Sequence, residues 1–208
     1  MKVLLINGSV HLNGTTKATL NIVAEKLNNN GIETEIIDIG GDPIRDCMSC
    51  GKCKDGSGRC AFNDDIVNRF LEKAEGADGF VFGTPVYYSH PAGRLLDFMD
   101  RVFYAGGKVM KHKPVFSLAV ARRTGSVASI DVMNKHFTIS QMPVISSTYW
   151  NQTHGSKGED VVKDEEGVET MLNAAENMAW ILKCIEAGKK QNIFPPNTVK
   201  TKRTNFIR

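Results

Sequence analysis

The feature of this sequence that most limits its fold is a regular alternation of short apolar segments with longer amphipathic ones. The short segments are rich in β-branched and aromatic residues and end at turn residues, which is typical of strands buried on both faces. They cover residues 3–6, 34–39, 79–83, 114–121 and 143–147. Parallel neighbours need crossover connections, and these are usually helices. We therefore predict an α/β fold with a doubly wound, five-stranded parallel sheet in three layers.

Helical patterns follow each of these strands. They lie at residues 20–27, 66–71, 95–103, 127–137 and 168–185. The first is followed by Gly31, which can end a helix in the left-handed conformation, and the last is closed by Gly188. The second follows Asp64 and Asp65, whose charges favour a helix N-terminus.

The length and charge of the chain restrict its domain count and its partners. A length of 208 residues suits one domain, and a net charge of +3 lacks the basic excess of a nucleic-acid binder. No apolar run reaches the roughly 20 residues of a membrane span, and no signal-peptide core is present. We expect a single domain over residues 1–208, with a C-terminal tail at 189–208, in a cytoplasmic protein that binds neither nucleic acid nor membranes.

Small and hydroxyl-bearing residues follow the first strand, from Asn7 to Thr16. In an open parallel sheet, ligands bind at the carboxyl ends of strands where the strand order reverses. Backbone N–H groups at a helix start, with hydroxyls beside them, can hold a phosphate without a lysine. Thr15 stands where a Walker A loop has lysine, and the dinucleotide pattern G-x-G-x-x-G is missing. Either this loop holds the phosphate of a mononucleotide, or its Ser and Thr side chains only cap the helix.

Two more loops are expected at the same edge of the sheet. The one after the third strand places Tyr87 and Tyr88 in a proline-rich turn, where they would lie against a flat heterocycle or pack on the next helix. The one after the fourth strand carries Arg122 and Arg123. Their charges would stabilise an anionic reduced flavin, attract the phosphates of a nicotinamide donor, or simply be solvated.

Four of the five cysteines lie between the second strand and the second helix, spaced C-x2-C-x2-C-x6-C. They are Cys47, Cys50, Cys53 and Cys60. Three-residue intervals match the first part of the bacterial ferredoxin motif and favour a four-iron four-sulfur cluster in this insertion at residues 47–60. Zinc is the weaker match, and thiols without metal or disulfides are the other alternative. Cys184, in the last helix, is expected to be a small buried apolar residue.

Three motifs together resemble the flavodoxin-like NADPH-dependent FMN reductases, in particular the iron-sulfur flavoproteins. They are the N-G-S-x-x-x-x-G-T-T loop from Asn7, the G-T-P-V-Y-Y segment from Gly83, and the cysteine motif. The resemblance covers nearly the whole chain and implies a flavodoxin-like sheet, FMN as cofactor, and a homodimer or homotetramer. It implies that the FMN phosphate is bound by Ser9, His11, Asn13, Gly14, Thr15 and Thr16. It also implies that the isoalloxazine ring lies between Pro85, Val86, Tyr87, Tyr88 and Ser89 on one side and Arg122, Thr124 and Gly125 on the other.

We therefore predict an FMN-dependent oxidoreductase that passes electrons from NAD(P)H or ferredoxin to a small acceptor such as a quinone or another aromatic. The flavin would carry the redox chemistry, so no catalytic acid or base is assigned. His154 lies in a segment that also resembles these flavoproteins, and we favour a structural role for it. The alternatives are a non-enzymatic flavin and iron-sulfur electron carrier, and a redox-sensing or zinc-binding structural protein without flavin.

Overall fold

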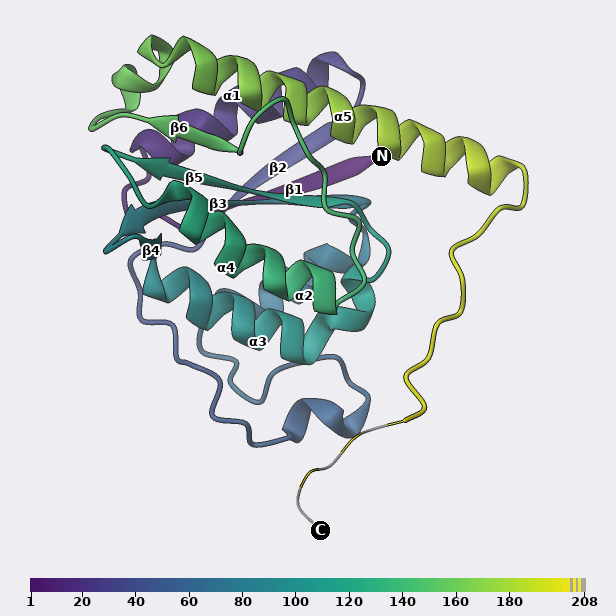
Figure 1. Ribbon diagram of the computed structural model, residues 1–208. Helices are drawn as coiled ribbons and strands as arrows, with labels where there is room; N and C mark the ends of the chain where they lie inside the picture. The colour runs from purple at the N-terminus through teal and green to yellow at the C-terminus, as the bar shows by residue number, and fades with distance from the viewer. Residues whose placement is uncertain (203, 205, 207–208) are drawn as a thin grey trace.

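The computed structural model describes residues 1–202, 204 and 206, and in this part of the chain five strands form one parallel sheet in the order β2-β1-β3-β5-β6 (Figure 1). Their bounds are β1 (Lys2–Asn7), β2 (Glu33–Asp38), β3 (Gly79–Tyr87), β5 (Val115–Ala121) and β6 (Gln152–His154). A short sixth strand, β4 (His90–Pro91), pairs antiparallel with the end of β3. This is the doubly wound flavodoxin-like order, in which the direction of winding reverses between β1 and β3. The predicted five-stranded parallel sheet is confirmed.

Helices cover both faces of the sheet, which gives the three predicted layers (Figure 1). One face carries α1 (Thr15–Asn29) and α5 (Glu165–Lys190), and the other carries α2 (Ile66–Glu75), α3 (Gly93–Met110) and α4 (Ser126–Ile139). Short 3-10 helices lie at Lys52–Asp55 and Gly158–Lys163. As the charge pattern predicts, α2 begins at an acidic residue: the Asp65 side chain accepts the Val67 N–H at 3.0 Å.

Each face of the sheet has its own core because successive side chains of a strand point to opposite sides. In β1, Val3 and Leu5 pack toward α1 and α5, while Leu4 and Ile6 pack toward α2 and α3, and all four are fully buried. This two-sided burial is why the central strands are apolar without interruption.

The fifth strand differs from the prediction. Of residues 143–147, only Val144 forms an isolated bridge to β5, and the regular strand is β6, further along the chain. Pro143 has no N–H with which to continue a ladder. The chain therefore leaves the sheet edge after Ile145 and returns where the Asn151 carbonyl accepts the Ala119 N–H at 3.0 Å. The 146–151 loop leads into the amino end of β6, and its Tyr149 and Trp150 line a pocket with the loop that follows β5.

The C-terminal region differs from its prediction in two places. Helix α5 continues through Gly188 to Lys190, so the tail begins at residue 191. Cys184 is exposed, and its prediction as a buried residue is wrong. The buried positions of α5 recur every three or four residues up to Leu182, and this spacing continues to 185 and 186, which leaves Cys184 on a different face.

The tail touches the body of the protein at Thr198, whose carbonyl accepts a hydrogen bond from Lys111 Nζ at 2.6 Å. Residues 203, 205 and 207–208 of the predicted tail lie outside the described residues. In the described chain, none of the helices is both long enough and apolar enough to cross a membrane.

Candidate functional site

The loop after β1 is fixed by hydrogen bonds from the strand that precedes it. Asn7 Oδ1 accepts the Ser9 N–H at 3.1 Å, and Asn7 Nδ2 donates to Asp38 Oδ1 at 2.8 Å. Gly8 approaches β3 so closely that a Cβ would lie 2.7 Å from the Gly83 carbonyl oxygen, so only glycine fits here. The sequence motif included Asn7 and Gly8 but gave no sign that Asp38, on another strand, holds the loop.

This loop leaves a group of donors unused where α1 begins. Thr16 is 1% exposed, and its Oγ1 has no hydrogen-bond partner within the described part of the chain. In the same residues, no side chain caps α1, whose N-cap residue is Gly14. The capping role considered from the sequence is therefore not what these hydroxyls do. The Thr16 hydroxyl and the first N–H groups of α1 are hydrogen-bond donors at the helix N-terminus. Such a group of donors suits a phosphate.

The remaining residues of the predicted phosphate loop surround this point. Ser9 is buried and its Oγ accepts the His11 N–H at 3.0 Å, while His11 and Asn13 are exposed. Lys17, in the first turn of α1, is bound to Asp38 with its Nζ 2.8 Å from Oδ2. Its charge is thus paired within the protein.

The segment after β3 is a tight hairpin rather than a long loop. Pro85 and Val86 belong to β3 itself, and Tyr88 and Ser89 form the turn to β4 with φ angles of 51° and 61°. Such turns usually use Asn-Gly, because other residues are strained at positive φ by about 1–3 kcal/mol each. Tyr88 is fully exposed and Tyr87 is half exposed. The alternative that both tyrosines pack on the following helix is wrong, because the turn directs them to the surface.

The loop after β5 packs directly on this hairpin. Gly125 has a φ of 95°, and a Cβ there would lie 2.5 Å from the Ser89 Cα. Arg122, Arg123 and Thr124 are exposed around it. The predicted residues from three separate loops therefore meet at one edge of the sheet. We call residues 8–16, 85–89 and 122–126 the strand-end cradle.

A segment that the sequence did not single out covers the first of these loops. A Cβ at Gly158 would lie 3.0 Å from the Asn13 carbonyl oxygen. The segment is held by Asp160, which accepts the N–H groups of Ser156 at 3.1 Å and Lys157 at 2.9 Å. Bonding to Lys163 first, and to these N–H groups second, lowers the pKa of Asp160 to about 2.

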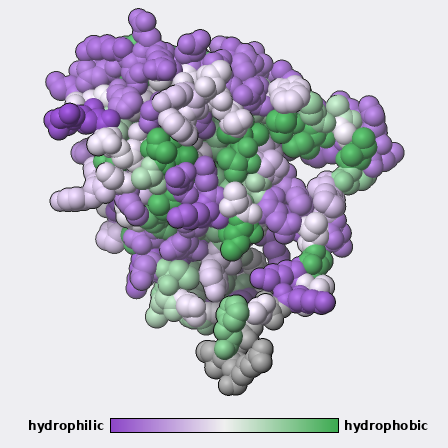
Figure 2. Space-filling model, viewed as in Figure 1, coloured by the Kyte–Doolittle hydropathy of each residue, from purple (hydrophilic) through white to green (hydrophobic). Residues whose placement is uncertain are grey.

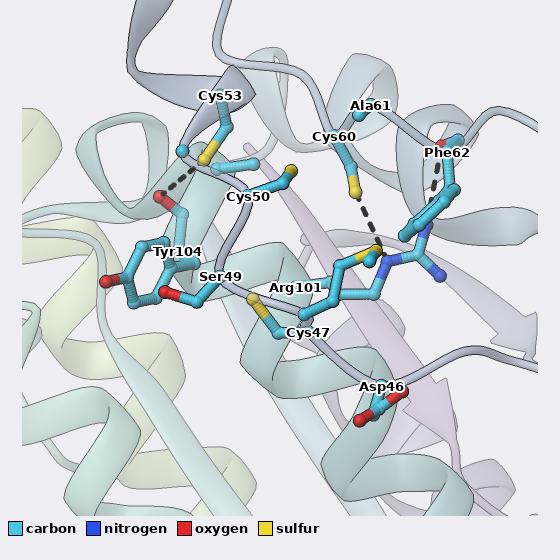
Figure 3. A pocket seen from close by; sticks show the side chains of 13 residues that line it. Asp46, Cys47, Ser49, Cys50, Cys53, Cys60, Ala61, Phe62, Arg101 and Tyr104 are labelled. Atoms are coloured by element: carbon cyan, nitrogen blue, oxygen red, sulfur yellow. Dashed lines mark hydrogen bonds between the residues drawn. The ribbon is translucent and has the colours of Figure 1, made fainter.

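The four cysteines of the motif line one pocket beside α3 (Figure 3). Figure 3 shows Cys60 with Arg101 on one side of this space and Cys53 with Tyr104 on the other. Cys53 Sγ lies 3.9 Å from the Tyr104 carbonyl oxygen. Burial first, and then the nearness of the other three thiols, raises the pKa of Cys53.

Cys60 is the most firmly held of the four. Its Sγ accepts a hydrogen bond from Arg101 Nε at 3.3 Å, and its N–H donates to Asn68 Oδ1 at 2.8 Å. Arg101 is 1% exposed and forms an ion pair with Asp65, the residue that caps α2. Sequence reasoning missed Asn68, eight residues after Cys60 on α2, and the contact of Arg101, which lies 41 residues from Cys60 on α3.

The arrangement of the thiols bears on which metal they suit. No three His, Cys, Asp or Glu side chains of the described chain are placed to hold a single metal ion. A tetrahedral zinc site needs its thiolates at about 2.3 Å from one ion, so the zinc alternative finds no support here. A four-iron cluster is a larger body, and its thiolates lie further apart around it. Four thiols around one cavity suit such a cluster by donor type and number.

The sheet order and the cradle define the class of this protein: it is a flavodoxin-like α/β protein with a site at the switch point between β1 and β3. The chain belongs to the NADPH-dependent FMN reductase family, whose model matches residues 1–157. It is therefore an FMN-dependent flavoprotein oxidoreductase.

Individual relatives support the same assignment, and solved structures of lower identity support the fold. The chain is 31% identical over 198 residues to an iron-sulfur flavoprotein of Methanocaldococcus jannaschii, covering 89% of this chain and 100% of that one. It is 28% identical to an FMN-dependent NADPH-azoreductase of Staphylococcus aureus, covering 80% and 82%. Among solved structures, an archaeal flavodoxin has a TM-score of 0.59 at 12% identity, covering 88% of this chain and 99% of that one. A flavone reductase has a TM-score of 0.66 at 20% identity, covering 89% and 64%.

Proposed function

We propose that this protein is an NAD(P)H-dependent reductase that binds FMN in the strand-end cradle and reduces a small aromatic acceptor such as a quinone. The observation that carries the proposal is the unbonded, buried Oγ1 of Thr16 at the start of α1. Bound FMN would supply the redox chemistry by accepting two electrons from the nicotinamide and passing them on.

The residues of the cradle divide the work of holding the cofactor. Thr15, Thr16 and the first N–H groups of α1 would donate to the phosphate, with Ser9, His11, Asn13 and Gly14 forming the loop around it. The strained hairpin from Pro85 to Ser89 would hold one side of the ring, and Arg122, Thr124 and Gly125 the other. The two exposed arginines, Arg122 and Arg123, are suited to attract the phosphates of a nicotinamide donor.

We also propose that Cys47, Cys50, Cys53 and Cys60 hold a four-iron four-sulfur cluster. Support comes from their shared cavity and from relatives named as iron-sulfur flavoproteins. The same observations favour a second candidate function, a carrier that exchanges electrons with ferredoxin without turning over a nicotinamide.

We further propose that the chain forms a homodimer or homotetramer. Ile139, Val144 and Trp150 are exposed large apolar side chains. Figure 2 shows apolar patches on the face that it draws. Light scattering on the purified protein would measure the assembly directly.

One preparation tests the cofactors and separates the two candidate functions. Anaerobically purified protein should show flavin absorbance, bound iron and no zinc, and it should oxidise NADPH or NADH with a quinone. Rapid exchange with reduced ferredoxin and no turnover of either nicotinamide would instead favour the carrier. Replacing Thr15 and Thr16 together by Ala should loosen FMN more than Arg123→Ala does, since only the first variant removes donors at the helix end. Equal FMN retention in both variants would count against the phosphate assignment.

A further inference from the structure

A depression of about 480 Å3 opens beside the cradle, between the β5–α4 loop and the segment that leads into β6. Its inner end is formed by Ser89 and Gly125, and its outer end by Tyr149, Trp150 and His154. A molecule in the depression would adjoin the ring that we propose to lie against Ser89 and Gly125. The volume is in the range of small-molecule sites.

The outer end offers a flat aromatic wall. Tyr149 and Trp150 meet edge to face, with ring centroids 4.6 Å apart at 70°. Both lie in the 146–151 loop and are about half exposed. A hydrogen bond joins the two sides of the depression: Ser126 Oγ, at the start of α4, donates to Gln152 Oε1, at the start of β6, at 2.5 Å. An exposed aromatic pair on a rigid loop is suited to receive a planar ring.

His154 is oriented at this wall by a carboxylate. Its Nδ1 lies 3.0 Å from Asp164 Oδ2, and its backbone N–H donates to the same oxygen at 2.7 Å. Asp164 is itself fixed, because its Oδ1 accepts the Gly167 N–H at the start of α5. A carboxylate on Nδ1 sets the tautomer and leaves Nε2 for other partners.

Nothing in the described chain bonds to Nε2, and the side chain of His154 is 37% exposed on the depression. The oriented ring and its free Nε2 leave His154 able to bond to a molecule in the depression. The charged and titratable groups that line the depression or the adjoining pocket with His154 are Asp164 and Glu166 at the start of α5, Arg123 from the β5–α4 loop, and Tyr149 from the 146–151 loop.

We propose that this depression is the acceptor site, that it takes a quinone, and that His154 donates a proton to the quinone oxygen. Conversion to a hydroquinone adds two electrons and two protons. The hydride of NAD(P)H accounts for both electrons and one proton. The imidazolium of His154 supplies the second proton from Nε2 and is recharged from solvent, while the nicotinamide leaves oxidised. This inference rests on the proposed reductase function.

A pair of acceptors tests the proton donor separately from the reductase activity. Ferricyanide takes one electron at a time and no proton, whereas 1,4-naphthoquinone needs the proton. His154→Gln should lower kcat/KM for the quinone by about 100-fold, the usual scale of general acid catalysis, and change ferricyanide reduction less than about twofold.

Binding gives a readout that does not depend on turnover. In a Trp180→Phe background the remaining tryptophan is Trp150, so added naphthoquinone should quench its fluorescence in the FMN-free protein. His154→Gln should retain most of that quenching. His136→Gln is the matched control, because His136 also pairs with a carboxylate, Asp100 at 2.9 Å, away from the depression.

Each result has one consequence. If the wild type fails to reduce ferricyanide with NAD(P)H, the proposed function is wrong, and the fluorescence titration still tests the site. If ferricyanide reduction is normal while His154→Gln leaves the quinone rate unchanged, or lowers both rates equally, the inference about His154 is wrong. Absence of Trp150 quenching, or wild-type activity with an azo dye but not with the quinone, would overturn the acceptor site and its class.

Discussion

The strand-end cradle and the cysteine loop, residues 40–62, are held in different ways. The cradle consists of strand ends in close backbone contact, as Gly8 on Gly83 and Gly125 on Ser89 illustrate. The cysteine loop has no strand and no α-helix among its residues, and one face of α3 holds it through side chains. Arg94 donates to the carbonyls of residues 40–42, and Arg101, seven residues later on the same face, holds the other end.

The conformation of the cradle is therefore set by the sheet, whereas the conformation of the cysteine loop is set by side chains of other elements. The cradle should keep its geometry without a cofactor, because the sheet itself places its parts. The cysteine loop should depend on a few side-chain contacts, above all those of Arg101. The following changes test this contrast, from the largest expected effect to the smallest.

Arg101→Leu should cost about 3–5 kcal/mol of unfolding free energy, because it leaves Asp65 buried without its partner. Urea denaturation measures the loss, and limited proteolysis should cut the cysteine loop first. The control is Arg59→Leu, which breaks a more exposed pair with Glu75 and should cost less than about 1 kcal/mol. Equal losses would mean that Arg101 is not what holds the loop.

Gly125→Ala should destabilise by about 3 kcal/mol and weaken FMN binding, because the new Cβ overlaps Ser89 at a positive φ. Gly56 has nearly the same φ, 94°, but nothing lies within 4 Å of its Cβ position. Gly56→Ala should therefore cost only about 1 kcal/mol and leave FMN binding unchanged. Thermal denaturation and FMN titration of both variants would decide the point. Similar costs at the two sites would contradict the close-packed cradle.

Thr16→Val should leave the stability of the FMN-free protein unchanged, since the hydroxyl has no partner to lose, and should weaken FMN binding about tenfold. Thr19→Val, one turn along α1, removes a buried bond to Thr153 Oγ1 of 2.8 Å. It should cost about 1 kcal/mol of stability and spare FMN binding. Calorimetric titration measures FMN affinity, which should fall only in Thr16→Val. Urea denaturation measures stability, which should fall only in Thr19→Val. The reverse result would mean that Thr16 does not bind the phosphate.

Lowering the pH should release the segment that covers the first loop. Asp160 has its pKa lowered to about 2, against about 3.9 in an unfolded chain, so its stabilising effect is complete above pH 4 and is lost as the pH falls toward 2. Asp160→Asn should flatten the fall of Tm between pH 4 and pH 2. The effect is the smallest of the set because the group is exposed and screened by salt. If Tm falls equally between pH 4 and pH 2 in both proteins, Asp160 does not stabilise this segment.

The sequence predicts the fold and the cradle because local rules determine them. Apolar runs such as Val3 to Ile6 mark buried strands, and the residues that follow them lie at one edge of the sheet whatever the details of packing. The sequence predicts a proline-rich turn at Tyr87 and Tyr88, but not the tight hairpin, because the positive φ angles of Tyr88 and Ser89 break those local rules.

Contacts between distant parts of the chain are what the sequence does not show. Arg101 reaches Cys60 across 41 positions, and Asp38 reaches Asn7 across 31. The fifth strand was misplaced for a related reason: residues 143–147 have the composition of a strand, but Pro143 and the departure of the chain after Ile145 leave only one bridge there. Which residues form an edge strand depends on tertiary contacts as well as on composition.

The central claim, that the unbonded donors at the start of α1 hold the phosphate of FMN, can be tested with the wild type alone. Riboflavin lacks only that phosphate, so the ratio of its dissociation constant to that of FMN isolates the group. Because several donors contribute about 1.5–3 kcal/mol each, we expect FMN to bind at least about 100-fold more tightly. Equal affinities for the two flavins, measured by the quenching of their fluorescence, would contradict the account.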